Sequence, residues 1–457
     1  MHVAFNQDAS CCVTGTEHGF RVYNCSPFGK FYTSDDITGL GGVGVARMLF
    51  ATSLVAVVGN GELNSPRRLA IVNTRRHAAH SVICELTFPT AVRHLLLNRQ
   101  RLVVVLDAQI YIYNIANMKL LFTLDTVSNR GGVASITPRV ATHKPADPDP
   151  AGSGAGSGSG AGHTEPDQDP NQEPGPDLGT AADVSTERET STEAATSSGA
   201  SSATNISSTS NNWLVYPAGP PTKHHLAPPK TAGDVPKAPQ GDVVLFDMDT
   251  LAPVTVIKAH RSPLALLQLN EDGTLLATTS DKGTLIRVFA IPSGTLLYEL
   301  RRGSYQSQVY SISFSLGSKL LCVSSATQTV HIYRLDAAHR VRRKKEPETT
   351  DSLELPDPVD HADPVEPVTS AVTDVSIDVK KKKHWLRWKP SASSKSHPQK
   401  RDFAWFKVPV KHTVRTVVGM PPLANFVYVA TESGKLFHFS LPESGGECPR
   451  AGEFQLD

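Results

Sequence analysis

A unit of about forty residues with four short apolar runs recurs along the chain, and this length and strand number are those of a β-propeller blade. Residues 264–300 hold one copy as LALLQLN, LLATTS, LIRVFAI and LLYEL, separated by the turns EDG, DKG and PSG. The final copy reads TVVGM, VYVATE and LFHFSL. We therefore expect an all-β, WD40-like seven-bladed β-propeller, with blades that begin near residues 2, 42, 91, 131, 262, 307 and 412.

Two segments interrupt this repeat. Residues 145–211 hold eleven acidic residues, one basic residue and three large aliphatic residues. So little apolar surface does not offset the entropy of ordering the chain. Residues 337–401 are basic at both ends and acidic and proline-rich in the middle. We expect both segments to be disordered loop insertions on an intact propeller.

Removing the two insertions restores the repeat and divides the chain into five parts. The run NNWLVYPA resumes blade 4 after the first insertion, and RDFAWFKVP supplies the outer strand of blade 6 after the second. The expected parts are blades 1 to 3 and the start of blade 4 (1–144), the acidic insertion (145–211), the rest of blade 4, blade 5 and most of blade 6 (212–336), a blade 6 loop (337–401), and the outer strand of blade 6, blade 7 and a C-terminal tail (402–457).

Composition argues against several classes of protein. The formal net charge is +1, so no global excess of charge indicates a nucleic-acid partner. No stretch approaches the roughly 18–20 apolar residues of a membrane span, and the first residues lack the pattern of a signal peptide, so we expect a cytoplasmic protein. The six cysteines form no C-x-x-C pair, which argues against a disulfide framework or a zinc site.

Catalytic motifs are also weak. GLGGVG at 39–44 satisfies G-x-G-x-x-G, but a pair of strand-like runs follows it, so no helix N-terminus is present to bind a phosphate. We interpret it as a turn between blades. The sequence shows no coherent set of nucleophile, base and orienting residue. We therefore expect a protein that is not an enzyme and binds no cofactor or metal.

Two adjacent arginines, Arg301 and Arg302, end a strand-like run and precede Gly303. Successive side chains of a strand point to opposite faces, so on an outermost strand each arginine serves a different groove beside the blade. Arginine binds phosphate with two donors at once, and glycine allows close approach. We expect both side chains to be exposed donors. The alternative is a pair of solvated charges that protect an edge strand from aggregation.

Hydroxyl groups accompany cations in two successive blades. Short neutral donors around one fixed cation suit a phosphorylated sugar alcohol better than a flat carboxylate. The first group is Thr278, Ser280, Gly283, Thr284 and Arg287. The second group is Ser325, Thr329 and His331, which alternate onto one strand face.

The segment KKKKHWLRWK at 380–389 places Trp385, Leu386 and Trp388 among basic residues. Tryptophan beside lysine and arginine is typical of a membrane-surface anchor, because the rings settle at the level of the lipid headgroups. A nuclear-localisation or RNA-binding patch and an ordinary solvated loop are the alternatives.

These motifs together resemble a known family. The tandem arginines with glycine, AH-x-SP at 259–263, ATTSDKGTLIRVF at 277–289, YSISFS at 310–315 and TVHIYRL at 329–335 are similar to the PROPPINs, β-propellers that bind polyphosphoinositides. MLFATSLVAVVG at 48–59 and SPRRLAIVNT at 65–74 match as well, and the autophagy branch is the most similar. The family signature usually begins with Phe, where this chain has Leu300.

The resemblance implies two sites for phosphatidylinositol 3-phosphate or the 3,5-bisphosphate, in blades 5 and 6. The first would use Thr278, Ser280, Gly283, Thr284, Arg287 and Arg301, and the second Arg302, Ser325, Thr329 and His331, with Gly303 completing the signature. It also implies that the blade 6 loop inserts into membranes. Pro66 and Arg67 match a loop that contacts the autophagic bridge-like lipid-transfer protein.

We therefore expect a non-enzymatic effector that reads 3-phosphoinositides on preautophagosomal, endosomal and vacuolar membranes. A generic WD-type scaffold that binds only proteins is the alternative.

Overall fold

The computed structural model describes residues 1–139, 211–219, 241–336 and 401–457, apart from 35–36, 38–39, 62–63, 78–79, 412–413 and 423–424. The insertions expected at 145–211 and 337–401 therefore lie outside the described residues, except for the last residue of each. Residues 220–240 lie outside them as well. The described residues belong to one compact unit that joins Met1–Ala141 with Ser210–Asp457.

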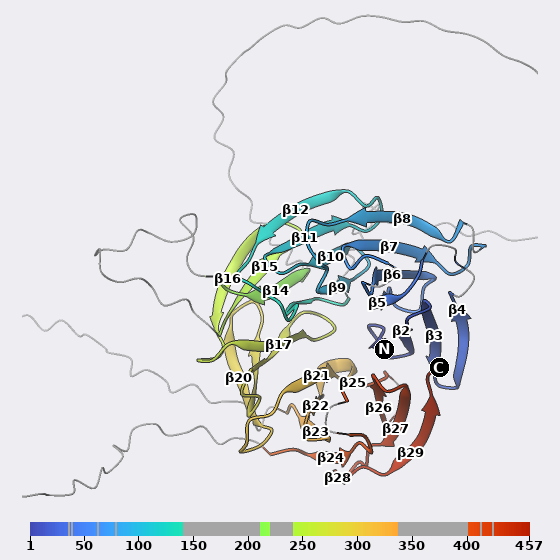
Figure 1. Cartoon of the computed structure of the whole chain (residues 1–457). Helices are drawn as coiled ribbons and strands as arrows, with labels where there is room; N and C mark the ends of the chain where they lie inside the picture. Colours follow the sequence, from blue (N-terminus) through green and yellow to red (C-terminus); the bar gives the residue numbers. More distant parts are fainter. Residues whose placement is uncertain are drawn as a thin grey trace, which may run out of the picture. The chain divides into compact units, whose positions relative to one another are not determined.

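These described residues form seven β-sheets, which confirms the predicted seven-bladed propeller (Figure 1). Blades 1 and 2 consist of β1 His2–Phe5, β2 Cys11–Gly15, β3 Phe20–Cys25, β4 Phe28–Thr33, and β5 Val43–Met48, β6 Leu54–Gly59, β7 Arg68–Asn73, β8 Val82–Thr87. Blades 3 and 4 consist of β9 His94–Leu97, β10 Arg101–Val105, β11 Gln109–Asn114, β12 Leu120–Asp125, and β13 Ser135–Ile136, β14 Trp213–Pro217, β15 Asp242–Asp247, β16 Ala252–Lys258.

The remaining blades follow the same antiparallel plan, except for an added strand in blade 6. Blade 5 consists of β17 Leu264–Leu269, β18 Leu275–Ser280, β19 Leu285–Ala290 and β20 Thr295–Arg301. Blade 6 consists of β21 Val309–Phe314, β22 Leu320–Ser325, β23 Thr329–Arg334, β24 Ala404–Lys407 and β28 Gly446–Glu447. Blade 7 consists of β25 Thr416–Gly419, β26 Phe426–Thr431, β27 Lys435–Ser440 and β29 Arg450–Gln455.

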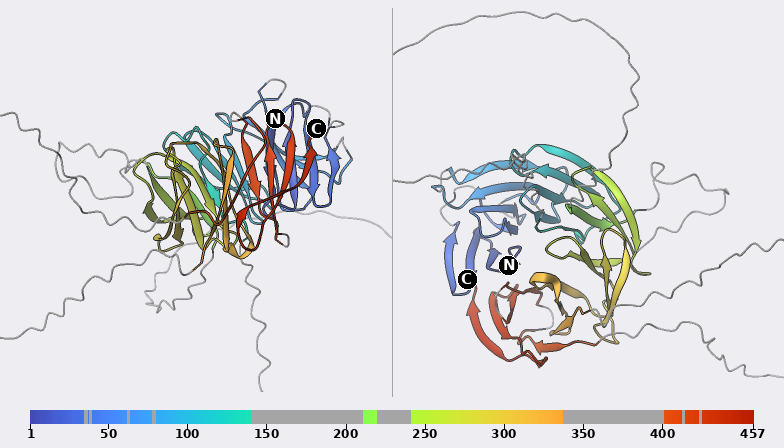
Figure 2. Two further views of the ribbon diagram at one scale, coloured as in Figure 1. Left: turned by 90° about the horizontal axis from the view of Figure 1, so that it is seen from below. Right: turned by 180° about the vertical axis from the view of Figure 1, so that it is seen from behind.

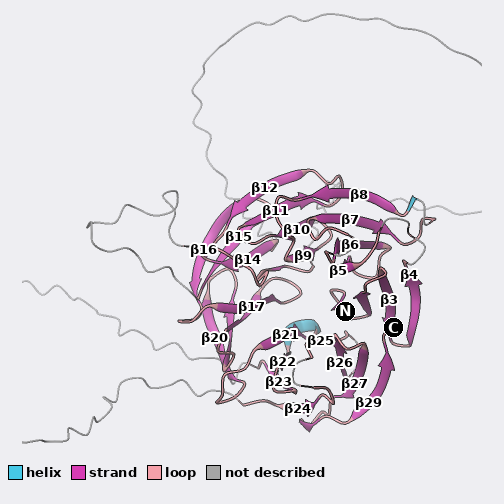
Figure 3. Ribbon diagram, viewed as in Figure 1, coloured by secondary structure: helices cyan, strands magenta, loops and turns pink. Residues whose placement is uncertain are grey.

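Helix is scarce in this fold. Strands and loops make up nearly all of the described chain, with a short 3₁₀ turn, η2, at Leu316–Ser318 (Figure 3). No helix in the described residues is long and apolar enough to cross a membrane.

The innermost strand of each blade contacts the innermost strand of the next. These contacts run from β1 to β5, β9, β13, β17, β21 and β25, and β25 contacts β1 again. The seven sheets are therefore arranged as a closed ring around an axis (Figure 2).

Middle strands are apolar on both faces because a blade packs against two neighbours. In β10, Leu102 and Val104 join a cluster with blade 2, while Val103 and Val105 join a cluster with blade 4. Side chains of a strand alternate between its faces, so one continuous apolar run serves two cores. Outer strands such as β8 alternate between partly buried and exposed residues because solvent meets them.

The ring closes between blades 7 and 1 without a shared strand, since β1 to β4 come from the N-terminus and β25 to β27 with β29 from the C-terminus. Apolar packing of Val3 and Tyr23 against Tyr428 and Leu456 forms this interface. Tyr23 also donates a hydrogen bond to the main-chain oxygen of Asp457 at 2.9 Å. Residues Arg450–Gln455, expected as part of a tail, form β29, the outermost strand of blade 7.

Blade 6 gains an additional strand from the chain of blade 7. Strand β28 pairs in parallel with β24, with Ala404 opposite Gly446 and Trp405 opposite Glu447. This pairing covers part of the outer edge of blade 6, which would otherwise present unpaired backbone groups.

Candidate functional site

Arg301 is the last residue of β20, the outermost strand of blade 5. It lies opposite Leu285, and Glu299 lies opposite Arg287. Directly opposed residues of an antiparallel pair share a face. Phe289, two residues beyond Arg287 on β19, packs in the cluster shared with blade 4. Arg301 and Arg287 therefore occupy the blade 4 side of blade 5.

A hydrogen-bonded network occupies this side. Arg287 is within 2.9 Å of Glu299 and donates to the main-chain oxygen of Ala259 at 2.7 Å. Thr278 lies opposite Arg287, and its Oγ1 is 2.9 Å from Nε2 of His260. Burial, with the nearby charge of Arg287, lowers the pKa of His260 to about 4, so the ring is neutral at pH 7. The network ties blade 5 to the chain segment that leaves blade 4.

This network changes the roles expected for the first group of residues. Thr278 is fully buried and Ser280 nearly so, whereas Thr284 is half-buried and Arg301 is exposed. Thr278 therefore positions the strand pair and is not at the surface. The exposed charge on this side belongs to Arg301.

Gly283 and Gly303 differ in whether the structure requires glycine at the position. Gly283 has a φ of +58°, and a Cβ there would collide with the main-chain oxygen of Ser307. The turn between β18 and β19 thus requires glycine. Gly303 meets no such limit, since no atom lies within 4 Å of the position that its Cβ would occupy. Open space therefore surrounds Gly303 in this structure.

Arg302 is buried, so the expectation that both arginines are exposed was wrong for this residue. It is 7% exposed, and its guanidinium donates to the main-chain oxygens of Gly283 and Tyr305. Burial also lowers the pKa of Arg302. The chain turns back immediately after β20, and the turn encloses the side chain. Arg302 therefore links the β18–β19 turn to the loop that leads into blade 6.

Leu300, the residue before the two arginines, packs into the core as the strand pattern predicts. Leu300 is fully buried in the cluster shared by blades 5 and 6, together with Tyr298 and Tyr333. The hydroxyl of Tyr333 donates to the main-chain oxygen of Arg301 at 2.9 Å. The end of β20 is thus held from the blade 6 side.

The second group of residues lies on blade 6 and faces blade 5. Val323 and Tyr333 pack in the cluster shared with blade 5, and Ser325 and His331 lie two residues from them on the same strand faces. Thr329, at the start of β23, shares the face of His331. Ser325 is buried, and the other two are half-buried. Arg301 and this group therefore flank blade 5 on opposite sides.

Asp402 is a residue of this site that sequence reasoning missed. Its Oδ2 lies 2.8 Å from Nδ1 of His331. The hydrogen bond from His331 is the main reason that the pKa of Asp402 is lowered. Asp402 directly follows the long insertion in sequence, so no spacing along the chain connects it with His331. The pairing of strand β23 with β24 brings the two residues together.

The other expected residues are distributed elsewhere. Trp385, Leu386 and Trp388 lie outside the described residues. Pro66 is half-buried and Arg67 is exposed at the start of β7. The Nε of Arg67 donates to the main-chain oxygen of Phe88 at 2.8 Å. The guanidinium of Arg67 therefore already supports the fold of blade 2.

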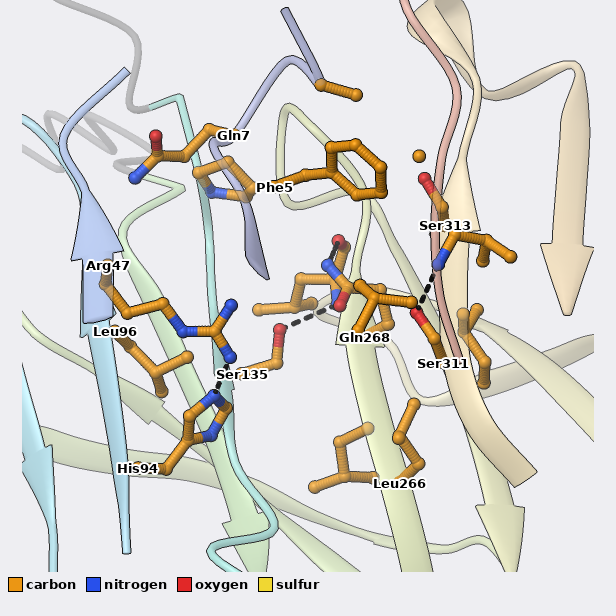
Figure 4. A pocket seen from close by; sticks show the side chains of 18 of the residues that line it. Phe5, Gln7, Arg47, His94, Leu96, Ser135, Leu266, Gln268, Ser311 and Ser313 are labelled. Atoms are coloured by element: carbon orange, nitrogen blue, oxygen red, sulfur yellow. Dashed lines mark hydrogen bonds between the residues drawn. The ribbon is translucent and has the colours of Figure 1, made fainter. Parts of the chain in front are cut away.

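A cavity of about 550 Å³ on the propeller axis was not predicted from the sequence (Figure 4). Innermost strands of the blades line it, among them the segments that carry Arg47 and His94. It is separate from the residues at the end of β20. In the part of the chain that the structure describes, no group of His, Cys, Asp and Glu residues could hold a metal ion.

The family model for PROPPIN matches residues 1–154 and 233–354. The chain belongs to the PROPPIN family. The protein is 39% identical to autophagy-related protein 18 of Yarrowia lipolytica, over 99% of this chain and 96% of that protein. It is 33% identical to autophagy-related protein 18 of Mycosarcoma maydis, over 100% of this chain and 92% of that protein.

Solved structures show the same fold. A structure described as the complex of KlAtg21 with the coiled coil of AgAtg16 is 23% identical with a TM-score of 0.58, and covers 100% of this chain and 99% of that chain. Hsv2 of Kluyvelomyces marxianus is 16% identical with a TM-score of 0.57, over 100% and 98% of the two chains. This PROPPIN is thus an autophagy-related β-propeller.

The burial of Arg302 generates a prediction about stability. Arg302→Thr leaves the oxygens of Gly283 and Tyr305 without their donor, at about 1.5–3 kcal/mol for each charged hydrogen bond. Arg301→Thr changes an exposed residue and should shift the free energy of unfolding by less than about 0.5 kcal/mol. Urea and thermal unfolding of the two single variants should therefore differ clearly. Equal midpoints would show that the guanidinium of Arg302 contributes nothing to the fold.

Proposed function

We propose that this PROPPIN is a non-enzymatic effector that binds phosphatidylinositol 3-phosphate or the 3,5-bisphosphate through blades 5 and 6. The observation that carries the proposal is the end of β20. There the buried Arg302 fixes the backbone that carries the exposed Arg301, whose guanidinium donates to Oγ of Ser304 at 3.2 Å. A planar guanidinium on a fixed backbone loses less freedom when it binds a phosphate than one on a loosely held backbone.

The two sides of blade 5 offer different donors for such a headgroup. Arg301 supplies a charge on the blade 4 side, where the charge of Arg287 is paired with Glu299. Thr284 precedes Leu285 and so shares the face of Ile286, which packs toward blade 6. Thr329 and His331 supply a hydroxyl and a ring nitrogen on the blade 6 side. Charge-assisted hydrogen bonds to phosphate are about twice as strong as neutral ones. The blade 4 side therefore has the stronger single donor, Arg301.

Recruitment would place this protein in the cytoplasm and on the surfaces of preautophagosomal, endosomal and vacuolar membranes. The long blade 6 insertion is proposed as a second anchor, because headgroup binding with an apolar insertion holds a protein at a membrane better than either alone. The autophagic bridge-like lipid-transfer protein is the proposed partner at Pro66 and Arg67.

The alternative is a WD-type scaffold that binds proteins without lipid. One related propeller, KlAtg21, was solved with the coiled coil of AgAtg16, and this favours protein binding as an additional activity of the family fold. Vesicle binding separates the two functions, because a scaffold of this kind would not bind vesicles through the lipid headgroup.

The first test uses Arg301→Gln, because Arg302 is needed for the fold. Loss of one charge-assisted contact of about 1.5–3 kcal/mol should weaken flotation with vesicles containing either 3-phosphoinositide by roughly tenfold or more. Arg130→Gln, at an 83% exposed arginine between blades 3 and 4, is the matched control and should float normally. Undiminished flotation of Arg301→Gln would favour the scaffold.

The second test concerns the basic and aromatic segment. Changing Trp385, Leu386 and Trp388 together to Ser should strongly reduce vesicle association yet leave binding of the soluble inositol headgroup near normal. The remaining association should become more sensitive to salt, since only electrostatic attraction is left. Conservative replacement by Phe, Met and Phe should retain flotation. The segment is not an anchor if the Ser variant floats as well as the wild type.

The third test concerns blade 2. Pro66→Ala with Arg67→Ala should spare vesicle flotation and weaken recovery of the lipid-transfer protein in a pull-down. Arg76→Gln, at an exposed arginine in the same blade, serves as the control. Because Arg67 also bonds to Phe88, thermal unfolding must show an intact fold in both variants. Equal recovery with all three proteins would contradict the assignment.

A further inference from the structure

Arg47 extends from β5 toward the cavity on the propeller axis, and Figure 4 shows it beside His94 of β9. One of its terminal nitrogens lies 2.7 Å from Nε2 of His94. The Nε of Arg47 is buried and has no hydrogen-bond partner. A buried guanidinium with an unused donor carries a cost in free energy unless an acceptor reaches it.

His94 does not neutralise this charge. Its Nδ1 lies 3.0 Å from the main-chain oxygen of Gly132, which only accepts, so Nδ1 carries the proton. Nε2 is then the acceptor for Arg47, and the ring is neutral. Burial and the charge of Arg47 lower the pKa of His94 to about 3, consistent with this assignment. The pair therefore keeps the full positive charge of Arg47.

The carboxylates that line the same cavity have other partners. Asp8 accepts from Ser10, Glu271 pairs with Arg139 at 3.0 Å, and Glu432 lies 3.8 Å from Arg415. The lining also contains further basic groups. His2 lies close enough to Arg47 that burial and this charge lower its pKa to about 3. The ring of His2 is therefore neutral as well, and within the described residues no carboxylate forms an ion pair with Arg47.

Two serines add donors on other walls of the cavity. The Oγ of Ser135 accepts from the backbone N–H of Leu269 at 3.0 Å, and the Oγ of Ser311 accepts from that of Val418 at 3.2 Å. A hydroxyl that accepts in this way keeps its own proton for donation. Figure 4 shows both serines on walls of the cavity that contains Arg47.

We propose that the axial cavity binds a soluble phosphate group, with Arg47 as the main cationic donor and Ser135 and Ser311 as additional donors. A volume of about 550 Å³ exceeds that of inorganic phosphate alone, so a small phosphate ester fits the space. This site is independent of the proposed lipid site, because it uses innermost strands and not the end of β20. The proposed ligand is a soluble phosphate compound and not the phosphate of a membrane lipid.

The test measures thermal unfolding of the full chain in increasing inorganic phosphate, against sodium chloride at equal ionic strength. A ligand that binds only the folded state raises the midpoint with its concentration. The wild type should gain a few degrees in phosphate and little in chloride. Arg47→Met should lose this gain, while Arg301→Gln should keep it, which distinguishes the axial site from the lipid site. An equal rise in both salts, or a full rise in Arg47→Met, would overturn the proposal.

A second measurement covers the case in which Arg47→Met does not fold. Ser135→Ala with Ser311→Ala removes only the hydroxyl donors and leaves the charge. This variant should require several-fold more phosphate than the wild type for the same rise in midpoint. Equilibrium dialysis of the wild type with labelled phosphate should show binding that unlabelled phosphate displaces and phosphoinositide vesicles do not. Absence of any displaceable binding would also overturn the proposal.

Discussion

The closure of the ring by contacts between blades 7 and 1, without a shared strand, is the constraint on which the rest of this structure depends. Blade 7 takes all its strands from the C-terminal part of the chain and blade 1 from the N-terminal part, so no strand locks the two together. Val3, Tyr23, Tyr428 and Leu456 bury the contact between them. The terminal residue contributes through the hydrogen bond from Tyr23 and an ion pair with Lys30. Both ends of the chain thus stabilise the seven-bladed arrangement.

A closed ring also requires that each blade bury both of its faces. The core is therefore divided into separate clusters between neighbouring blades, and polar groups that reach these interfaces must find partners there. His260 and Thr278 satisfy one another between blades 4 and 5, and the guanidinium of Arg287 bonds to Ala259 and Glu299. His331 and Asp402 do so within blade 6, on the side that faces blade 5. The same interfaces that hold the ring together also position the charged end of β20.

Burial of Arg302 gives the candidate site its rigidity. Its guanidinium joins the turn at Gly283 to the loop at Tyr305, and Tyr333 holds the backbone of Arg301 from the next blade. Arg301 is therefore presented by groups from two blades. Arg47 is a contrasting case, since it is enclosed by the innermost strands but, within the described residues, has only a neutral histidine as its acceptor. Burial makes Arg302 a structural link, whereas the Nε of Arg47 is buried without a hydrogen-bond partner.

The sequence by itself determined the fold class, the number of blades and the faces of the strands, because a period of two along a strand and four strands per unit are local properties. It also separated Arg301 from Arg302 by strand face. Only the tertiary structure decided that Arg302 is buried and that Asp402 accepts a hydrogen bond from His331. It also decided that, among the described residues, no carboxylate forms an ion pair with Arg47. Those outcomes depend on how a turn closes and which strand pairs next, and these contacts join residues far apart in the chain. Spacing along a single strand carries no information about them.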